Sequence, residues 1–314
     1  MIFGSPPRAV VLWLAGLDLR LTLLAVPPVI PLIHRDLHLT ESGIAALSNL
    51  PVLVLAASSI LGALLTARLG ARRALAAGLW VIAVAGALRG AGPSVPLLFG
   101  MTLCMGVGIA LIQPAFPTLA RAWFPERIAF GTSIWANGLL CGEALSASLT
   151  LPFILPLAGD WERSLAVWSI PVALTAVLVA AVRDDVSGPR ASRSAWLPNF
   201  RDRRVWLLGT FQAAASLTYF GANTFMPDYL NATGQPQFIA GCLAGINVGQ
   251  IPASIAVGLA PMRLLGSRIT LYGVAALILA ALYLFLQSGG AGAVVAAVIL
   301  GGTSAYILTM SFAW

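Results

Sequence analysis

Two charged residues, Asp18 and Arg20, lie inside the apolar stretch LAGLDLRLTLLAV, residues 14 to 26. If this stretch crosses a bilayer, each charge near the midplane costs at least about 2.5 kcal/mol, so each needs a partner or a function. Arg20 lies about ten residues into the helix, or about 15 Å deep. Side chains two residues apart on a helix point to different faces, so Asp18 does not neutralise Arg20 directly.

A possible partner is Glu143, in the stretch CGEALSASL. It lies about 14 residues into a later apolar run that enters from the same side, so we expect it at a similar depth. We hypothesise that Arg20 binds an anionic or strongly dipolar small molecule, with Glu143 or Asp18 as counter-ion and proton carrier. The alternative is a buried Arg–Glu pair that only fixes helix packing.

Uncharged polar side chains are candidates for the lining of the same site. Gln113 follows a Gly-rich run and precedes a Pro, on a helix that we expect to be kinked. The other candidates share helical faces with one another, at spacings of three and four residues. Polar faces on membrane helices point to protein or water rather than lipid. These candidate substrate-binding residues are Gln113, Tyr219, Asn223, Asn247 and Gln250.

Proline and histidine residues follow Arg20. Pro27 and Pro28 remove backbone donors and predict a gating bend, whereas Pro31 is expected to end the helix. His34 and His38 have the spacing of a metal pair, but we expect them in a short outer loop without a third ligand. The sequence therefore predicts no metal site and no cofactor.

The composition is that of a membrane protein. Of 314 residues, 59% are hydrophobic and 9% are charged, against roughly 25% charged in soluble domains. Apolar runs long enough to cross about 30 Å of hydrocarbon follow one another. They are residues 10–33, 43–67, 73–92, 96–120, 129–155, 162–182, 205–230, 237–262, 267–287 and 292–313.

The charge distribution predicts the topology. The net charge is +7, and most of the 18 basic residues fall in inner loops if the N-terminus is cytoplasmic. The basic character therefore reflects membrane topology, and no nucleic-acid partner is expected. Cys104, Cys141 and Cys242 lie within apolar runs and are read as packing residues.

The long polar stretch from 183 to 204 divides the chain into two halves that resemble each other at an offset of 198 residues. We expect an N-terminal six-helix bundle at 1–183, a cytoplasmic linker at 184–204, and a C-terminal bundle at 205–314. The offset leaves the last two helices of the second bundle without counterparts in the chain. We therefore expect ten helices in two parallel bundles, from a fragment or from a truncated gene product.

The chain resembles the Major Facilitator Superfamily, and within it the bacterial cyanate and 2-nitroimidazole transporter branch. The resemblance is carried by the triplet Asp18-Leu19-Arg20, by the run from Gly106 to Pro117, and by Gly249-Gln250. Four further residues fit the superfamily signature between the second and third helices and are expected to have gating or structural roles: Gly62, Gly70, Arg72 and Arg73.

The resemblance implies an all-α polytopic fold and a secondary active transporter in the bacterial inner membrane. It would move a small anion or small polar organic solute by alternating access, coupled to protons or to exchange, and we expect it to act as a monomer in the lipid bilayer. The alternative is a truncated non-transporting remnant or a membrane sensor. An enzyme is not expected, because no catalytic constellation lies within the apolar runs.

Overall fold

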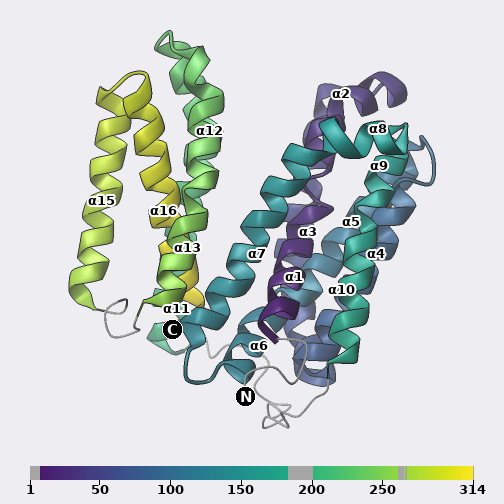
Figure 1. The fold of residues 1–314 in the computed structure, drawn as a ribbon, viewed down its shortest axis with the longest axis horizontal. Coiled ribbons are helices and arrows are strands. Elements are labelled where there is room, and N and C mark those ends of the chain that lie inside the picture. Colours follow the sequence, from purple (N-terminus) through teal and green to yellow (C-terminus); the bar gives the residue numbers. More distant parts are fainter. Residues whose placement is uncertain (1–7, 183–200, 261–264, 266, 314) are drawn as a thin grey trace. The chain divides into compact units, whose positions relative to one another are not determined.

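The computed structural model describes residues 8–182, 201–260, 265 and 267–313. These residues are helical throughout apart from short turns, and no strand occurs among them (Figure 1). All ten predicted apolar runs contain helix, which confirms the predicted all-α fold. Most of the predicted linker, residues 184–200, lies outside the described part of the chain.

The chain divides into two compact units. The first comprises residues 1–126 and 138–197, and the second comprises 127–137 and 198–314. Residues 127–137, at the start of one long helix, therefore belong with the C-terminal unit, while the rest of that helix belongs with the N-terminal one.

The N-terminal unit is built from the helices of the first half of the chain, drawn in purple to teal (Figure 1). They are α1 (Arg8–Leu21), α2 (Val26–Leu37), α3 (Glu41–Leu69), α4 (Ala71–Arg89), α5 (Val95–Ile112), α6 (Ala115–Trp123), α7 (Ile128–Leu149), a π-helical turn (Thr150–Ile154), α8 (Leu155–Ala158), α9 (Trp161–Val167) and α10 (Ser169–Ala181).

The C-terminal unit contains the start of α7 and the later helices. These are α11 (Arg203–Ala232), a 3-10 turn (Pro236–Phe238), α12 (Ile239–Val248), α13 (Gln250–Leu259), α15 (Arg268–Gln287) and α16 (Ala291–Ala313).

Apolar runs form helices in a membrane because only internal hydrogen bonds can satisfy the backbone there. Among the described residues, seven helical segments are long and apolar enough to cross a membrane, or eight if the bent pair Ile128–Ser146 and Thr150–Ala158 is one span. The chain is therefore a multi-pass membrane protein.

The first span is broken, which corrects the prediction of one helix over 10–33. Turn residues 22–25 separate α1 from α2, and Pro27 and Pro28 occupy the first turn of α2 rather than the middle of a bend. The expectation that Pro31 ends the helix is wrong, because α2 continues to Leu37. His34 consequently lies within α2 and not in a loop.

Two other spans change from one helix to the next without a large bend. Residues 113 and 114 separate α5, which ends at Ile112, from α6, which begins at Ala115, and the two helices together form one candidate span, Val95–Trp123. In the span Gly241–Leu259, α12 passes into α13 at Gly249, whose φ and ψ are helical and whose N–H donates to the carbonyl oxygen of Gly245 at 2.9 Å. The kink near Gln113 and the common face of Asn247 and Gln250 stay predictions.

Glycines allow the helices to approach backbone to backbone. A Cβ at Gly62 on α3 would lie 2.2 Å from the carbonyl oxygen of Ala110 on α5, and one at Gly301 on α16 would lie 2.0 Å from the carbonyl oxygen of Ile246 on α12. Such close approaches supply the van der Waals contact that drives helix association in lipid.

We predict that Gly62→Ala lowers the stability of the protein by about 1–3 kcal/mol, because the added methyl group overlaps the α5 backbone. The midpoint of thermal unfolding in detergent measures the loss. Gly100→Ala on α5 is the matched control, since a Cβ there meets nothing within 4 Å. Equal midpoints for both variants would contradict the close contact between α3 and α5.

Candidate functional site

Arg20 and Glu143 come together in the N-terminal unit. Arg20 lies in the last turn of α1 and is half-buried. Glu143, on α7, is also half-buried and lies within electrostatic range of the Arg20 guanidinium. The two helices approach closely where α7 has glycine. A Cβ at Gly138 would lie 2.1 Å from the carbonyl oxygen of Trp13, and one at Gly142 would lie 2.1 Å from the carbonyl oxygen of Leu17. These glycines let α7 carry Glu143 towards the end of α1.

Asp18 is fully buried on another face of α1. The hydroxyl of Thr175, on α10, lies beside its carboxylate. Neither carboxylate oxygen makes a well-formed hydrogen bond within the described residues. Asp18 is therefore an acid held inside the unit, separate from the partner of Arg20.

Three of the predicted polar residues lie in the C-terminal unit, and two of them are in contact. The hydroxyl of Tyr219 on α11 donates to Oδ1 of Asn247 at 2.6 Å, and Nδ2 of Asn247 donates to the carbonyl oxygen of Leu243 at 2.8 Å. Gln250 starts α13 and is 4% exposed, with its Nε2 unbonded among the described residues. The side chain of Asn223 lies outside the described residues.

Gln113 lies in the N-terminal unit at the break between α5 and α6. It is half-buried, and its backbone N–H donates to the carbonyl oxygen of Ile109 at 3.2 Å. Pro27 is exposed and Pro28 is half-buried. None of these residues is in the unit that holds Tyr219 and Asn247.

Three residues of the superfamily signature, Gly70, Arg72 and Arg73, lie where α3 ends and α4 begins. Gly70 links α3 to α4 with a φ of +84°, a conformation that glycine adopts without strain. Nη1 of Arg72 donates to the carbonyl oxygen of Ala180 at 2.7 Å and to that of Val179 at 3.3 Å, at the carboxyl end of α10. Arg73 is exposed. Arg72 therefore supplies donors to carbonyl groups that the helix itself leaves free.

Arg89 is the charged residue that sequence reasoning missed. Counting charges for the topology places it at the outer end of the third span, whereas its side chain is fully buried and its Nη2 donates to the carbonyl oxygen of Thr22 at 2.6 Å. In the structure this end of α4 is tightly packed, because a Cβ at Gly86 would lie 2.5 Å from Oγ of Ser169 and one at Gly90 would lie 2.1 Å from the carbonyl oxygen of Glu162, but no pattern in the sequence marks Arg89 as buried.

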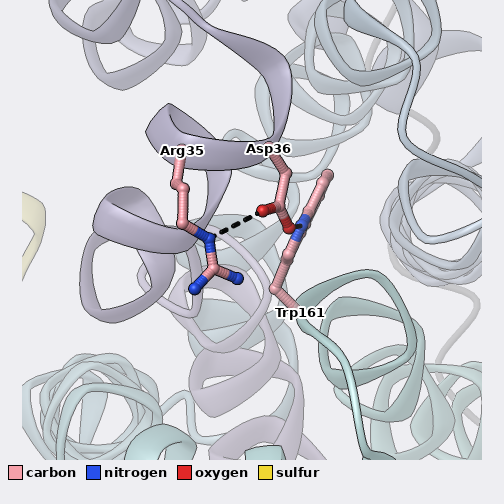
Figure 2. Close-up of polar contacts among 3 residues, drawn as sticks. All are labelled: Arg35, Asp36 and Trp161. Atoms are coloured by element: carbon pink, nitrogen blue, oxygen red, sulfur yellow. Dashed lines mark hydrogen bonds and ion pairs between the residues drawn. The ribbon is translucent and has the colours of Figure 1, made fainter.

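The far end of α2 is tied to α9 by a carboxylate (Figure 2). Oδ1 of Asp36 accepts a hydrogen bond from Nε of Arg35 and Oδ2 accepts one from Nε1 of Trp161, both at 3.0 Å. The Arg35 hydrogen bond, followed by the Trp161 hydrogen bond and the positive charge of Arg35, holds the pKa of Asp36 below its ordinary value, against the opposing effect of desolvation. This contact joins residues 125 positions apart in the sequence.

The family is decided by a match that extends over nearly the whole chain. The model of the Major Facilitator Superfamily matches residues 9–314. The chain belongs to the Major Facilitator Superfamily. This confirms the resemblance that the sequence indicates.

Curated relatives support the same branch. The cyanate transport protein CynX of Escherichia coli (strain K12) is 28% identical over 248 residues, which cover 78% of this chain and 64% of that protein. The 2-nitroimidazole transporter of the same strain is 29% identical over 234 residues, covering 73% of this chain and 58% of the relative. The match thus spans less than two thirds of the length of these relatives. Both are named as transporters rather than enzymes.

Solved structures share the fold. FucP, an outward-facing member of the superfamily, has a TM-score of 0.71 at 15% identity, over 96% of this chain and 83% of its own. The proton:xylose symporter XylE has a TM-score of 0.67 at 14% identity, over 98% of this chain and 80% of its own. At this identity the likeness establishes the major facilitator fold alone.

We predict that Asp36→Asn lowers the thermal unfolding midpoint at neutral pH but not in acid. The unfolded carboxyl titrates near pH 3.9 and the folded one below that, so the stabilisation is complete above about pH 5 and is lost as the pH falls through the folded pKa. Unfolding midpoints from pH 3 to 7 measure this. Glu162→Gln, on α9 beside Trp161, is the control, and a difference between Asp36→Asn and wild type that grows in acid would contradict the prediction.

Proposed function

We propose that the protein is a secondary active transporter that moves a small anion, such as cyanate, or a similarly small polar organic solute across the bacterial inner membrane. The observation that carries this proposal is Arg20, a cation at the carboxyl end of α1 within a membrane span. A permanent positive charge at this depth favours an anionic ligand. The names of the two E. coli relatives, a cyanate and a 2-nitroimidazole transporter, support a small substrate.

Arg20 and Glu143 form the charged centre of the proposed binding site. Arg20 can offer two parallel N–H donors to a small anion, a geometry that Lys cannot reproduce. The nearby Glu143 balances this charge when no substrate is bound. A substrate anion then competes with Glu143 for the guanidinium, which links substrate binding to the charge state of the acid.

Gln113, Tyr219, Asn223, Asn247 and Gln250 are proposed to contact the substrate during transport. Tyr219 and Asn247 are already joined by a hydrogen bond, and Nε2 of the buried Gln250 makes no hydrogen bond within the described residues. Such neutral groups hydrogen-bond a solute without holding it as strongly as a charge would. Release is then possible on either side of the membrane.

The transport cycle is proposed to be alternating access between an N-terminal bundle at 1–183 and a C-terminal bundle at 205–314, joined by a cytoplasmic linker at 184–204. Pro27, Pro28, Gly62 and Gly70 would serve as gating or packing positions, with Arg72 and Arg73 at the cytoplasmic side. The excess of Arg in the inner loops supports a cytoplasmic N-terminus. We propose a monomer that works without nucleic acid or cofactor.

Protons or exchanged solute are proposed to supply the energy. Asp18 and Glu143 are both acids within membrane spans, one fully buried and one half-buried. An acid inside a span that changes its protonation state during the cycle can couple proton movement to solute movement. Glu143 suits this role through its electrostatic interaction with Arg20, and Asp18 through its burial away from Arg20.

We predict that Arg20→Gln lowers the uptake of radiolabelled cyanate by reconstituted protein roughly 10- to 100-fold, the value of a hydrogen bond to a charged group. The uptake rate of Arg20→Lys should fall between those of wild type and Arg20→Gln, because Lys keeps the charge but loses the paired donors. Initial rates per amount of folded protein, determined at low cyanate concentration, measure the effect.

Arg163→Gln is the matched control for this measurement. Arg163 is 74% exposed in its side chain and pairs with Asp160 at 3.3 Å, far from α1 in sequence. Its substitution should leave uptake unchanged. Correctly inserted Arg20→Gln protein that takes up cyanate at the wild-type rate would sink the proposed role of Arg20, and no cyanate uptake by wild type would refute cyanate as a substrate.

We predict a separate effect for the two acids. The double variant Asp18→Asn, Glu143→Gln should lose uptake driven by a pH gradient while cyanate–cyanate exchange continues, because exchange needs no net proton movement. Uptake with and without an imposed gradient, compared with exchange in the same vesicles, tests this. Gradient-driven uptake that survives in the double variant would remove proton coupling through these acids.

A further inference from the structure

The break between α1 and α2 frees backbone carbonyl groups within a membrane span. In a continuous helix the carbonyl groups of Leu23 and Leu24 would accept from the N–H groups of residues 27 and 28, but both of these are Pro and have none. The N–H of Leu24 still donates to the carbonyl oxygen of Arg20 at 2.9 Å, the ordinary i to i−4 bond of a helix, and closes the last turn. Regular helix is then interrupted by turn residues 22–25, between α1 and α2.

Arg89 binds the first carbonyl group beyond that turn. Its Nη2 donates to the carbonyl oxygen of Thr22 at 2.6 Å, and the whole side chain is buried. Arg89 is the last residue of α4, and the backbone just after it is pressed against α9: a Cβ at Gly90 would lie 2.1 Å from the carbonyl oxygen of Glu162. Arg89 is thus anchored on a tightly packed helix end and reaches across to α1.

The surroundings of Arg89 explain why a cation is tolerated there. The carboxyl end of a helix carries partial negative charge, and the exposed carbonyl groups at the break concentrate that charge near Thr22. Nε and Nη1 of Arg89 make no hydrogen bond within the described residues, so the contact with Thr22 is the one that fixes the guanidinium. On the same face of α4, Gly86 leaves room for Thr22 and Ser169.

We propose that Arg89 is a positioning residue for Arg20. By holding the carbonyl group of Thr22, Arg89 fixes the last turn of α1 against α4, and this turn carries Arg20 two residues earlier. The guanidinium of Arg20 is thereby held in one orientation towards Glu143 and the substrate. This inference rests on the proposed role of Arg20 in anion binding.

The first test separates substrate affinity from turnover. Arg89→Met should raise the KM for cyanate uptake about tenfold, the effect of losing a hydrogen bond from a charged donor, with a smaller change in kcat. Arg89→Lys should restore most of the affinity, because the contact with Thr22 uses a single N–H donor that Lys also supplies. If Arg89→Lys does not restore the KM while Arg163→Met has the wild-type KM, the positioning role is overturned.

The second test reads the position of residue 20 without transport. Cys104, Cys141 and Cys242 are replaced by Ala, Arg20→Cys is introduced, and its modification by the anionic reagent methanethiosulfonate ethylsulfonate is timed. Adding Arg89→Met should accelerate modification about tenfold, because the turn loses its anchor and opens more often. Adding Arg163→Met should not change the rate.

The modification rate tests the positioning role of Arg89 separately from the transport of cyanate. An unchanged modification rate with Arg89→Met would overturn the positioning role even if Arg20 proves essential for uptake. An accelerated rate supports positioning even if the protein does not carry cyanate. If Arg89→Met does not fold, Arg89→Leu, which likewise removes the donor, is compared with Arg89→Lys in the same two assays, and equal rates and KM values in both would overturn the proposal.

Discussion

Every backbone carbonyl group within a membrane span needs a donor, and Pro27, Pro28 and Pro31 remove three N–H donors from the region of the first span. Pro27 and Pro28 remove the N–H groups that would continue the helix, so the chain turns out of helix between Leu21 and Val26. Water cannot fill the place of these donors in hydrocarbon. Arg20 lies just before this break, and the buried Arg89 binds the carbonyl group of Thr22 within it.

The break also gives the site its electrostatic character. A helix that ends within the membrane presents the negative end of its dipole there, which stabilises cations in its last turn. Arg20 lies in that turn and Arg89 binds the carbonyl group just beyond it. Both arginines are thus associated with the carboxyl end of α1, and Glu143 lies within electrostatic range of Arg20. Transporter folds use interrupted helices in the same way to hold ions and charged substrates.

The sequence predicts the helices well because each depends on one continuous apolar run. Asp18 and Arg20 could be singled out for the same reason, since charges inside such runs are visible without a structure. The burial of Arg89 could not be predicted, because an Arg at the end of an apolar run has the same pattern whether it faces water or a neighbouring helix. The bond from Trp161 to Asp36 likewise depends on a neighbour distant in sequence.

The central claim is that Arg20 is the group that binds the anion, and all basic residues of the chain are Arg. Solid-state NMR can therefore measure dipolar contact between 13C-cyanate and protein whose arginines carry 15N at the guanidinium nitrogens. We expect contact at hydrogen-bonding distance in the wild-type protein and its loss in Arg20→Lys, where no guanidinium remains at that position. A contact that persists in Arg20→Lys would assign the anion to another arginine and contradict the account.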